Sequence, residues 1–252
     1  GGYGTLANDA PTGDGVSILT RIQDLKAIGG NVIISFGGAA GTDPATVATS
    51  IQQLQAEYQS VINKYGVNSL DFDIEGATVS DQASIHLRDQ ALAALEAANP
   101  GLKVSFTLPV LPTGLVDSGL KVLQSAKADG VHIDTVNVMA MDYGVDNGKQ
   151  MGTDAINAAL STYAQLQQLG MANTKIGITV LIGVNDISNE VFTLADAQQV
   201  LSFAQGKSWI SELSMWAMAR DNGSAPNITY QSPTASGLAQ EDYAFSHVFN
   251  LF

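Results

Sequence analysis

The sequence predicts an α/β fold in which parallel β-strands alternate with helices, and among such folds it favours a (β/α)8 TIM barrel. Six short runs rich in β-branched and aliphatic residues alternate with amphipathic stretches along the chain. Successive runs lie about 30 to 40 residues apart, which suits a barrel or a doubly wound sheet. No glycine-rich phosphate loop follows the first run, so a dinucleotide-binding sheet is the weaker prediction.

Each predicted strand is short and is followed by Gly, Pro, Asn or Asp, residues that commonly end strands. The predicted strands are Asn31–Phe36, Val67–Asp73, Lys103–Thr107, Thr135–Met141, Lys175–Val180 and Glu212–Met215. Six strands do not close the usual eight-stranded barrel. The sequence therefore shows six of the eight βα units that the fold requires.

The clearest predicted helix begins at Asp43, has Pro44 as its first helical residue and ends before Gly66. Asp is a favoured N-cap, Pro is tolerated in the first turn, and Gly commonly ends a helix. Further helices are predicted near residues 15–28, 79–98, 113–129, 152–169, 193–206 and 238–250. No low-complexity linker interrupts the pattern, so residues 1–252 are expected to form one domain.

The charge balance excludes some partners. The chain has 24 acidic and 11 basic residues, a formal charge of −13, which repels phosphate backbones and anionic membrane surfaces. No apolar run of about 18 residues could span a bilayer, and Gly1–Gly4 lack the start of a signal peptide. The absence of cysteine rules out disulfides and thiolate chemistry. We expect neither a nucleic-acid nor a membrane partner.

Three acidic residues fall on one face of the second predicted strand. Side chains two residues apart share a face, so Asp71, Asp73 and Glu75 would project together, with about 6.6 Å between successive Cα atoms. Asp is disfavoured in strands, and buried acids carry a desolvation penalty unless they are hydrogen-bonded, protonated or bound to a ligand. The opposite face, towards the helices, would take Leu70, Phe72 and Ile74. Packing alone does not explain the acids.

Three interpretations of this acidic strand remain open from the residues alone. It could be an edge strand with one solvated face, although its flanking apolar residues indicate burial. It could hold a hard cation such as Mg²⁺ or Ca²⁺, which binds oxygen ligands. It could perform general acid–base chemistry, because stacked carboxylates acquire different proton affinities. The third interpretation is favoured.

The segment Asn68 to Glu75 resembles the signature Asp-Gly-x-Asp-x-Asp-x-Glu of family-18 glycoside hydrolases, with the last three acids in register. Asn68 and Ser69 depart from this signature, and Ile74 stands where many members have an aromatic residue. Four other segments resemble the family in the same order: Ser35–Gly38, Met139–Gly144, Ile176–Gly183 and Ser214–Asn222. The resemblance thus extends over residues 35 to 222.

The resemblance implies a chitinase that uses substrate-assisted retention, in which the N-acetyl oxygen of the sugar attacks its own anomeric carbon. Glu75 would protonate the glycosidic oxygen and then activate water, while Asp73 would orient the acetamido group and Asp71 would support Asp73. Tyr143 would donate a hydrogen bond to the acetamido group. No cofactor and no metal ion are expected.

The resemblance also implies residues that bind the substrate. Trp216 would form the hydrophobic floor beneath the sugar, and Gly37 and Gly38, after Ser35, would allow close approach of backbone and substrate. By strand periodicity, Met141 would share a face with Tyr143; a position in the core is the alternative for methionine. Trp209 and the three histidines, His86, His132 and His247, match no motif and are expected to be structural or exposed.

The expected substrate is chitin or a shorter β-1,4-linked N-acetylglucosamine oligomer. An endo-β-N-acetylglucosaminidase acting on N-glycans would use the same acidic strand, and a chitin-binding lectin would keep Trp216 but normally lose Glu75. The protein is expected to be a secreted monomer whose signal peptide is absent from this chain. Because the acidic motif belongs to the family's fourth strand, two βα units are expected before Gly1.

Overall fold

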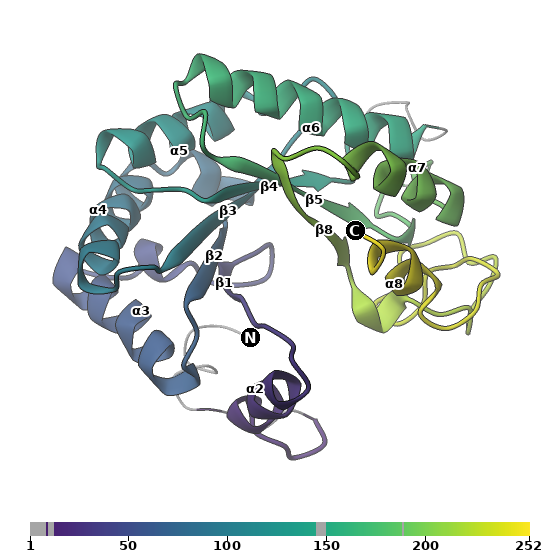
Figure 1. Cartoon of the computed structure of the whole chain (residues 1–252), viewed down its shortest axis with the longest axis horizontal. Helices are drawn as coiled ribbons and strands as arrows, with labels where there is room; N and C mark the ends of the chain where they lie inside the picture. The colour runs from purple at the N-terminus through teal and green to yellow at the C-terminus, as the bar shows by residue number, and fades with distance from the viewer. Residues whose placement is uncertain (1–8, 10–12, 145–149, 188) are drawn as a thin grey trace. The chain divides into compact units, whose positions relative to one another are not determined.

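The computed structural model describes residues 9, 13–144, 150–187 and 189–252, so Gly1–Gly4 lie outside the described residues. The chain divides into two compact units, and each is described by itself. Unit 1 contains Gly1–Thr107 and Asp117–Asp134, and unit 2 contains Leu108–Val116 and Thr135–Phe252. In Figure 1, unit 1 runs from purple to teal and most of unit 2 from green to yellow.

Unit 1 is built on three parallel strands, β1 (Ile34–Gly37), β2 (Ser69–Asp73) and β3 (Lys103–Pro109), of which the last two residues of β3 belong to unit 2. The strand register places Ser35 and Ser105 directly beside Asp71. It also places Gly37 and Thr107 beside Asp73. The register therefore places hydroxyl side chains and a glycine beside the acidic residues of β2.

The described residues of unit 1 form the α-helices α2 (Ile18–Ala27), α3 (Ile51–Tyr65), α4 (Gln82–Ala98) and α5 (Asp117–Ala128). Figure 1 shows α3 beside α4 and α4 beside α5, along one side of the strands. The core between them is aromatic, because the ring of Phe72 on β2 contacts the rings of Tyr58, Phe36 and Phe106. This core confirms that Phe72 faces the helices, opposite the acids.

The predicted helix start at Asp43 is wrong in part. Asp43 does cap a helix, accepting a hydrogen bond from the Ala45 N–H, but that helix is the short 3₁₀ helix η1 (Pro44–Thr46). The long helix α3 begins after Ser50, whose hydroxyl accepts from the Gln53 N–H. Ser and Thr side chains near residue 50 compete for backbone groups and favour a cap over continued helix.

Unit 2 is built on the parallel strands β4 (Thr135–Ala140), β5 (Lys175–Leu181) and β8 (Ile210–Trp216), with β5 in the middle. The strands β6 (Gly183–Val184) and β7 (Val191–Phe192) form a short antiparallel pair that the sequence analysis does not predict. The other elements are α6 (Met151–Gln168), α7 (Leu194–Ala204), the 3₁₀ helix η3 (Met218–Arg220) and α8 (Ala244–Phe249).

All six predicted strands are present, with ends that shift by a few residues. The helix predicted over 238–250 is shorter, because α8 begins only at Ala244. Within the described part of the chain, no helix is long and apolar enough to cross a membrane. The α/β class and the alternation of strands and helices are confirmed.

Candidate active site

Asp71 lies in the middle of β2 and is buried among hydroxyl groups. Its Oδ2 accepts a hydrogen bond of 2.6 Å from Ser35 Oγ, and its Oδ1 accepts one of 2.7 Å from Ser105 Oγ. Thr107 Oγ1 lies 2.9 Å from Oδ1 and 3.0 Å from Oδ2. Burial raises the pKa of Asp71, and these hydroxyl groups act in the opposite direction because they stabilise the carboxylate. Both oxygens are therefore held in place by neighbouring strands.

Asp73, two residues further along β2, has a strongly perturbed proton affinity. Burial raises its pKa to about 7, and the negative charges of Glu75 and Asp71 add to the shift. Its Oδ1 is buried and has no hydrogen-bond partner among the described residues. A carboxyl group with this pKa exchanges its proton near neutral pH, which is the property that acid–base chemistry requires.

Glu75 lies just beyond the end of β2, where its backbone is still extended at φ −138° and ψ 176°. The alternation of the strand therefore continues, and Glu75 stays on the face of Asp71 and Asp73, as predicted. A Cβ atom built on Gly38 would lie 3.4 Å from Asp73 Oδ2 and 3.9 Å from Glu75 Oε1. The structure thus brings Gly38 to both carboxylates.

The two glycines at the end of β1, Gly37 in the strand and Gly38 directly after it, are needed for this close approach. Gly37 has φ +101°, and a Cβ there would lie 2.2 Å from the Asp73 carbonyl oxygen. The Gly38 N–H donates to the same oxygen at 3.0 Å. A side chain at Gly37 would push the β1 loop away from Asp73. Ser35, predicted to contact substrate, donates its hydroxyl hydrogen to Asp71, so its observed contact is with the acid.

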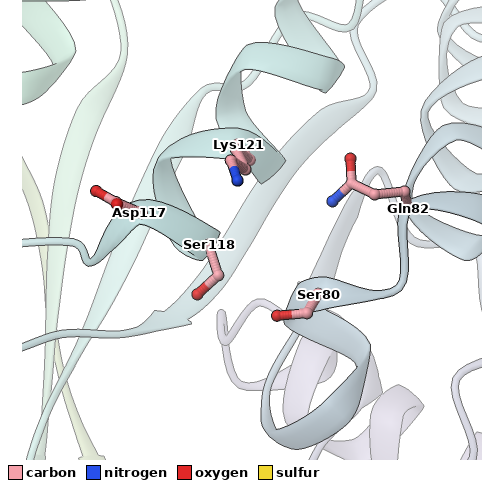
Figure 2. A pocket seen from close by; sticks show the side chains of 5 residues that line it. All are labelled: Ser80, Gln82, Asp117, Ser118 and Lys121. Carbon is pink, nitrogen blue, oxygen red and sulfur yellow. The ribbon is translucent and has the colours of Figure 1, made fainter.

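A separate pocket lies where the 3₁₀ helix η2 (Gly76–Ser80), which follows Glu75, meets the first turns of α4 and α5. Its volume is about 510 Å³, and Figure 2 shows the five side chains that line it: Ser80, Gln82, Asp117, Ser118 and Lys121. All five are polar. The lining has no aromatic ring on which a sugar could stack, and none of the predicted site residues belongs to it.

In unit 2, Trp216 is the last residue of β8, and its side chain is 59% exposed. Met141 is half-buried and directly follows β4. The register pairs Ala140 with Val180 and Trp216 with Leu181, so Met141 and Trp216 lie at the same edge of the unit's sheet, where its parallel strands end. Ligands of α/β proteins bind at this edge.

Tyr143 does not lie on the inner face that strand periodicity predicts. The strand β4 ends at Ala140, and Asp142 has a left-handed backbone with φ +47°, so the alternation stops before Tyr143. The Tyr143 hydroxyl is buried and has no hydrogen-bond partner among the described residues. Burial and the charges of Asp154 and Glu190 raise its pKa. In this conformation the hydroxyl faces the protein interior.

The sequence analysis misses two carboxylates in this region. Asp142 accepts hydrogen bonds from the N–H groups of Asp186 and Ile187, at 2.9 and 3.1 Å. Glu190, between β6 and β7, accepts from the N–H groups of Tyr143 and Gly144, both at 3.1 Å. Strand periodicity would place Asp142 on the face opposite Met141 and Tyr143, and Glu190 lies in a loop without a motif. Only the three-dimensional structure therefore identifies these two carboxylates.

Of the remaining residues, Trp209 packs against other aromatic rings, and the three histidines are exposed. Trp209 stacks on Tyr163, with ring centroids 4.3 Å apart, and contacts Phe203 edge-on, as expected for a packing residue. His86 lies 2.6 Å from Asp129, and His132 lies 3.7 Å from Asp134. Within residues 13–144, 150–187 and 189–252, no group of three or more His, Cys, Asp or Glu side chains could hold a metal ion.

Unit 1 has a parallel strand that leads into three carboxyl groups on one face, and unit 2 has an exposed tryptophan at the end of a parallel strand. Each is a feature found in α/β carbohydrate-active domains. No protein-family model matches the chain. A probable bifunctional chitinase/lysozyme of Escherichia coli is 35% identical over 254 residues, which cover 92% of this chain and 28% of that protein. The chain thus spans less than a third of this relative's length.

Solved structures show the same relationship. Active domain 2 of a chitinase from Pyrococcus furiosus is 36% identical, with a TM-score of 0.83, over 92% of this chain and 76% of that one. Its catalytic-site mutants have also been solved in complex with chito-oligosaccharides. A GH18 chitinase from Pseudoalteromonas aurantia is 19% identical, with a TM-score of 0.54, over 78% of this chain and 74% of that one. At this identity the similarity supports the fold and nothing further.

The chain belongs to the family-18 chitinases, glycoside hydrolases with a (β/α)8 barrel fold. The described residues contain six parallel strands of that fold, β1 to β5 and β8. The predicted family and fold class are therefore confirmed.

Proposed function

We propose that this chain hydrolyses β-1,4 linkages between N-acetylglucosamine residues in chitin or chito-oligosaccharides, by a substrate-assisted retaining mechanism. The observation that carries the proposal is the row of three carboxyl groups on β2 and directly after it, in which Asp71 is held by hydroxyl groups and burial raises the pKa of Asp73 to about 7. The chito-oligosaccharide complex of the Pyrococcus domain supports the choice of substrate.

In the proposed reaction, Glu75 donates a proton to the glycosidic oxygen as the bond to the anomeric carbon breaks. The acetamido oxygen of the same sugar attacks that carbon, so no protein nucleophile is needed. Glu75, now a carboxylate, then takes a proton from the water that opens the cyclic intermediate. The protein thus returns to its starting protonation state.

Asp73 is proposed to stabilise this intermediate. A carboxylate beside the acetamido nitrogen accepts its N–H hydrogen bond and offsets the positive charge that develops as the ring closes. Because its pKa is about 7, a substantial fraction of Asp73 is already a carboxylate at neutral pH, and this form offsets the positive charge without a further proton transfer. Asp71 lies behind it with both oxygens hydrogen-bonded, and its charge contributes to the raised pKa of Asp73.

The binding roles are assigned from position. Trp216, exposed at the end of β8, would stack on a sugar ring, and Met141 at the end of β4 would contribute apolar contact. Gly38 would leave room for the substrate beside the carboxyl groups of Asp73 and Glu75, and Gly37 would let β1 lie close to the Asp73 backbone, while Ser35 would act through Asp71. The resemblance gives Tyr143 a hydrogen bond to the acetamido group, but its hydroxyl is buried here, so the proposal does not use it.

We also propose that the protein acts as an extracellular monomer, because chitin is an insoluble polymer outside the cell. An endo-β-N-acetylglucosaminidase acting on N-glycans would share the β2 carboxylates. A comparison of the turnover of chito-oligosaccharides with that of N-glycans distinguishes the two activities.

The test is turnover of N-acetylglucosamine oligomers and of an N-glycan, with products sized and the first anomer identified by NMR. We expect oligomer cleavage with retention, no cleavage of fully deacetylated oligomers, and a loss of about 10² to 10⁴-fold in Glu75→Gln. Glu57→Gln is the matched control, because Glu57 lies on α3, where its carboxylate accepts a hydrogen bond from Gln53. An inverted first product, or near-normal turnover of Glu75→Gln, would refute the proposal.

A further inference from the structure

Two loops of unit 2 bind each other through carboxylates. The first loop, residues 141–144, follows β4, and the second connects β6 to β7. Asp142 of the first loop accepts hydrogen bonds from two N–H groups of the second, those of Asp186 and Ile187. Glu190 of the second loop accepts from two N–H groups of the first, those of Tyr143 and Gly144. We call this reciprocal arrangement the carboxylate clasp.

The Glu190 carboxyl group is fully buried, so it loses its hydration and needs hydrogen-bond donors within the protein. A buried carboxylate is unfavourable without hydrogen bonds or a counter-charge. Burial raises its pKa, the nearby charge of Asp142 adds to this, and the backbone N–H groups of Tyr143 and Gly144 act in the opposite direction. No ion pair to Glu190 occurs within the described residues. Its compensation comes from backbone N–H groups, so its position depends on the path of the 141–144 loop.

The path of that loop is unusual. Asp142 has φ +47°, a left-handed conformation that residues other than glycine seldom adopt. Such conformations persist where surrounding contacts determine them. Two hydrogen bonds of the clasp hold the Asp142 side chain, and the other two hold the N–H groups of the two residues that follow it. The half-buried Met141 lies directly before this turn, at the end of β4.

We infer that Glu190 is a positioning residue for substrate binding, which holds the 141–144 loop in its left-handed turn and so places Met141 and the half-buried Asp142 at the end of β4. This inference rests on the proposed function, because it assigns the loop to the sugar-binding edge. It goes beyond that function by assigning a role to a loop residue that does not contact substrate.

The test compares Glu190→Gln with a matched control, Asp221→Asn. Gln preserves the shape of the side chain, but one carboxylate oxygen becomes an NH₂ group, which cannot accept a hydrogen bond. Asp221 is equally buried in the same unit and accepts from two N–H groups at the start of α8, those of Phe245 and Ser246 at 3.0 and 2.8 Å. It also accepts from Gln240 Nε2 and from the Ser246 hydroxyl. Because Asp221 accepts more hydrogen bonds than Glu190, Asp221→Asn is expected to lower the melting temperature at least as much as Glu190→Gln.

Two readouts then separate positioning from simple stability. NMR hydrogen exchange should show the amides of Tyr143 and Gly144 exchanging about tenfold faster in Glu190→Gln and at the wild-type rate in Asp221→Asn. KM for N-acetylglucosamine oligomers should rise about fivefold to tenfold in Glu190→Gln, with kcat changed less, while Asp221→Asn keeps the wild-type KM.

Unchanged amide exchange in Glu190→Gln would show that the clasp does not hold the loop. Faster exchange with an unchanged KM would show that the loop does not position the substrate. Equal changes of KM in both variants would show that the change of KM follows from the loss of stability alone. Each of these results overturns the inference. A wild-type protein without turnover on any oligomer would instead refute the proposed function, and the clasp would then be judged by the amide exchange alone.

Discussion

The end of β2 and the end of β4 hold their carboxylates in different ways. On β2, Asp71 is held by side-chain hydroxyl groups from the two neighbouring strands, and the alternation of the strand continues through Glu75. After β4, Asp142 and Glu190 are held by backbone N–H groups of loops, and the alternation stops at a left-handed residue. The first arrangement tunes proton affinity, whereas the second determines a backbone path.

This difference predicts that changes on β2 act mainly on kcat and that changes in unit 2 act mainly on KM. After Glu75→Gln, the largest expected effect is that of Asp73→Asn. It removes the carboxylate proposed to stabilise the intermediate, so kcat should fall by about 10² to 10³-fold, with KM changed little.

The matched control for Asp73 is Asp89→Asn, since Asp89 on α4 is also buried and burial raises its pKa to about 6. Steady-state kinetics of both variants on one oligomer checks the expectation. Equal losses in kcat would mean that any buried acid of unit 1 matters as much as the acids of β2. The catalytic role proposed for Asp73 would then be contradicted.

The second prediction concerns the pH dependence of stability. The pKa of Asp73 is about 7 in the folded protein and near 3.8 when unfolded, so its protonated form contributes stability that is fully present below pH 4. This contribution is lost as the pH rises through 7. Because the side chain is only partly buried, we expect a loss of about 1 to 2 kcal/mol from this group.

Urea unfolding of the wild type and of Asp73→Asn at pH 4 and pH 8 isolates this contribution, because the other acids are common to both proteins. The wild type should lose more stability than Asp73→Asn over this range. A parallel loss in the two proteins would show that the proton affinity of Asp73 is ordinary.

The third prediction tests the hydroxyl groups around Asp71. Thr107→Val removes contacts to both of its oxygens, whereas Ser105→Ala removes one. Each change should destabilise the protein by about 1 to 2 kcal/mol, with Thr107→Val the larger, and should raise the pKa of Asp71 further, because hydroxyl donors stabilise its charged form. Chemical denaturation measures the first effect, and a carbon-detected NMR titration of the carboxyl group measures the second.

The smallest expected effect is that of Trp216→Ala. The exposed indole is proposed to stack on sugar, so KM should rise by about tenfold, while the melting temperature stays near that of the wild type. Trp209→Ala is the control, because Trp209 stacks on Tyr163 and its loss should lower stability and leave KM unchanged. The reverse pattern would assign Trp216 to packing and contradict its binding role.

The part of the site that sequence could predict is the part that regular structure positions. Strand periodicity predicts the common face of Asp71, Asp73 and Glu75 because β2 stays extended to its end. The same rule does not extend to Tyr143, because β4 ends at Ala140 and Asp142 has a left-handed backbone. That turn depends on contacts with the loop between β6 and β7, about 45 residues away.

Other contacts of the site depend on register. Ser105 and Thr107 are unremarkable residues in a predicted strand, and only the pairing of β2 with β3 brings them to Asp71. The same reasoning explains why strands and long helices are predicted well but the short pair β6 and β7 is not. Two-residue strands carry no periodicity that could reveal them.

The buried carboxyl groups also affect how the protein exchanges protons with its surroundings. Burial raises the pKa of Asp71, Asp73, Asp89, Asp142 and Glu190 in the folded state. Near pH 6, Asp73 and Asp89, whose pKa values burial raises to about 7 and about 6, retain protons that an unfolded chain would release, so the folded protein carries less negative charge than the unfolded chain. Unfolding at that pH therefore releases protons, and it lowers the pH of a weakly buffered solution.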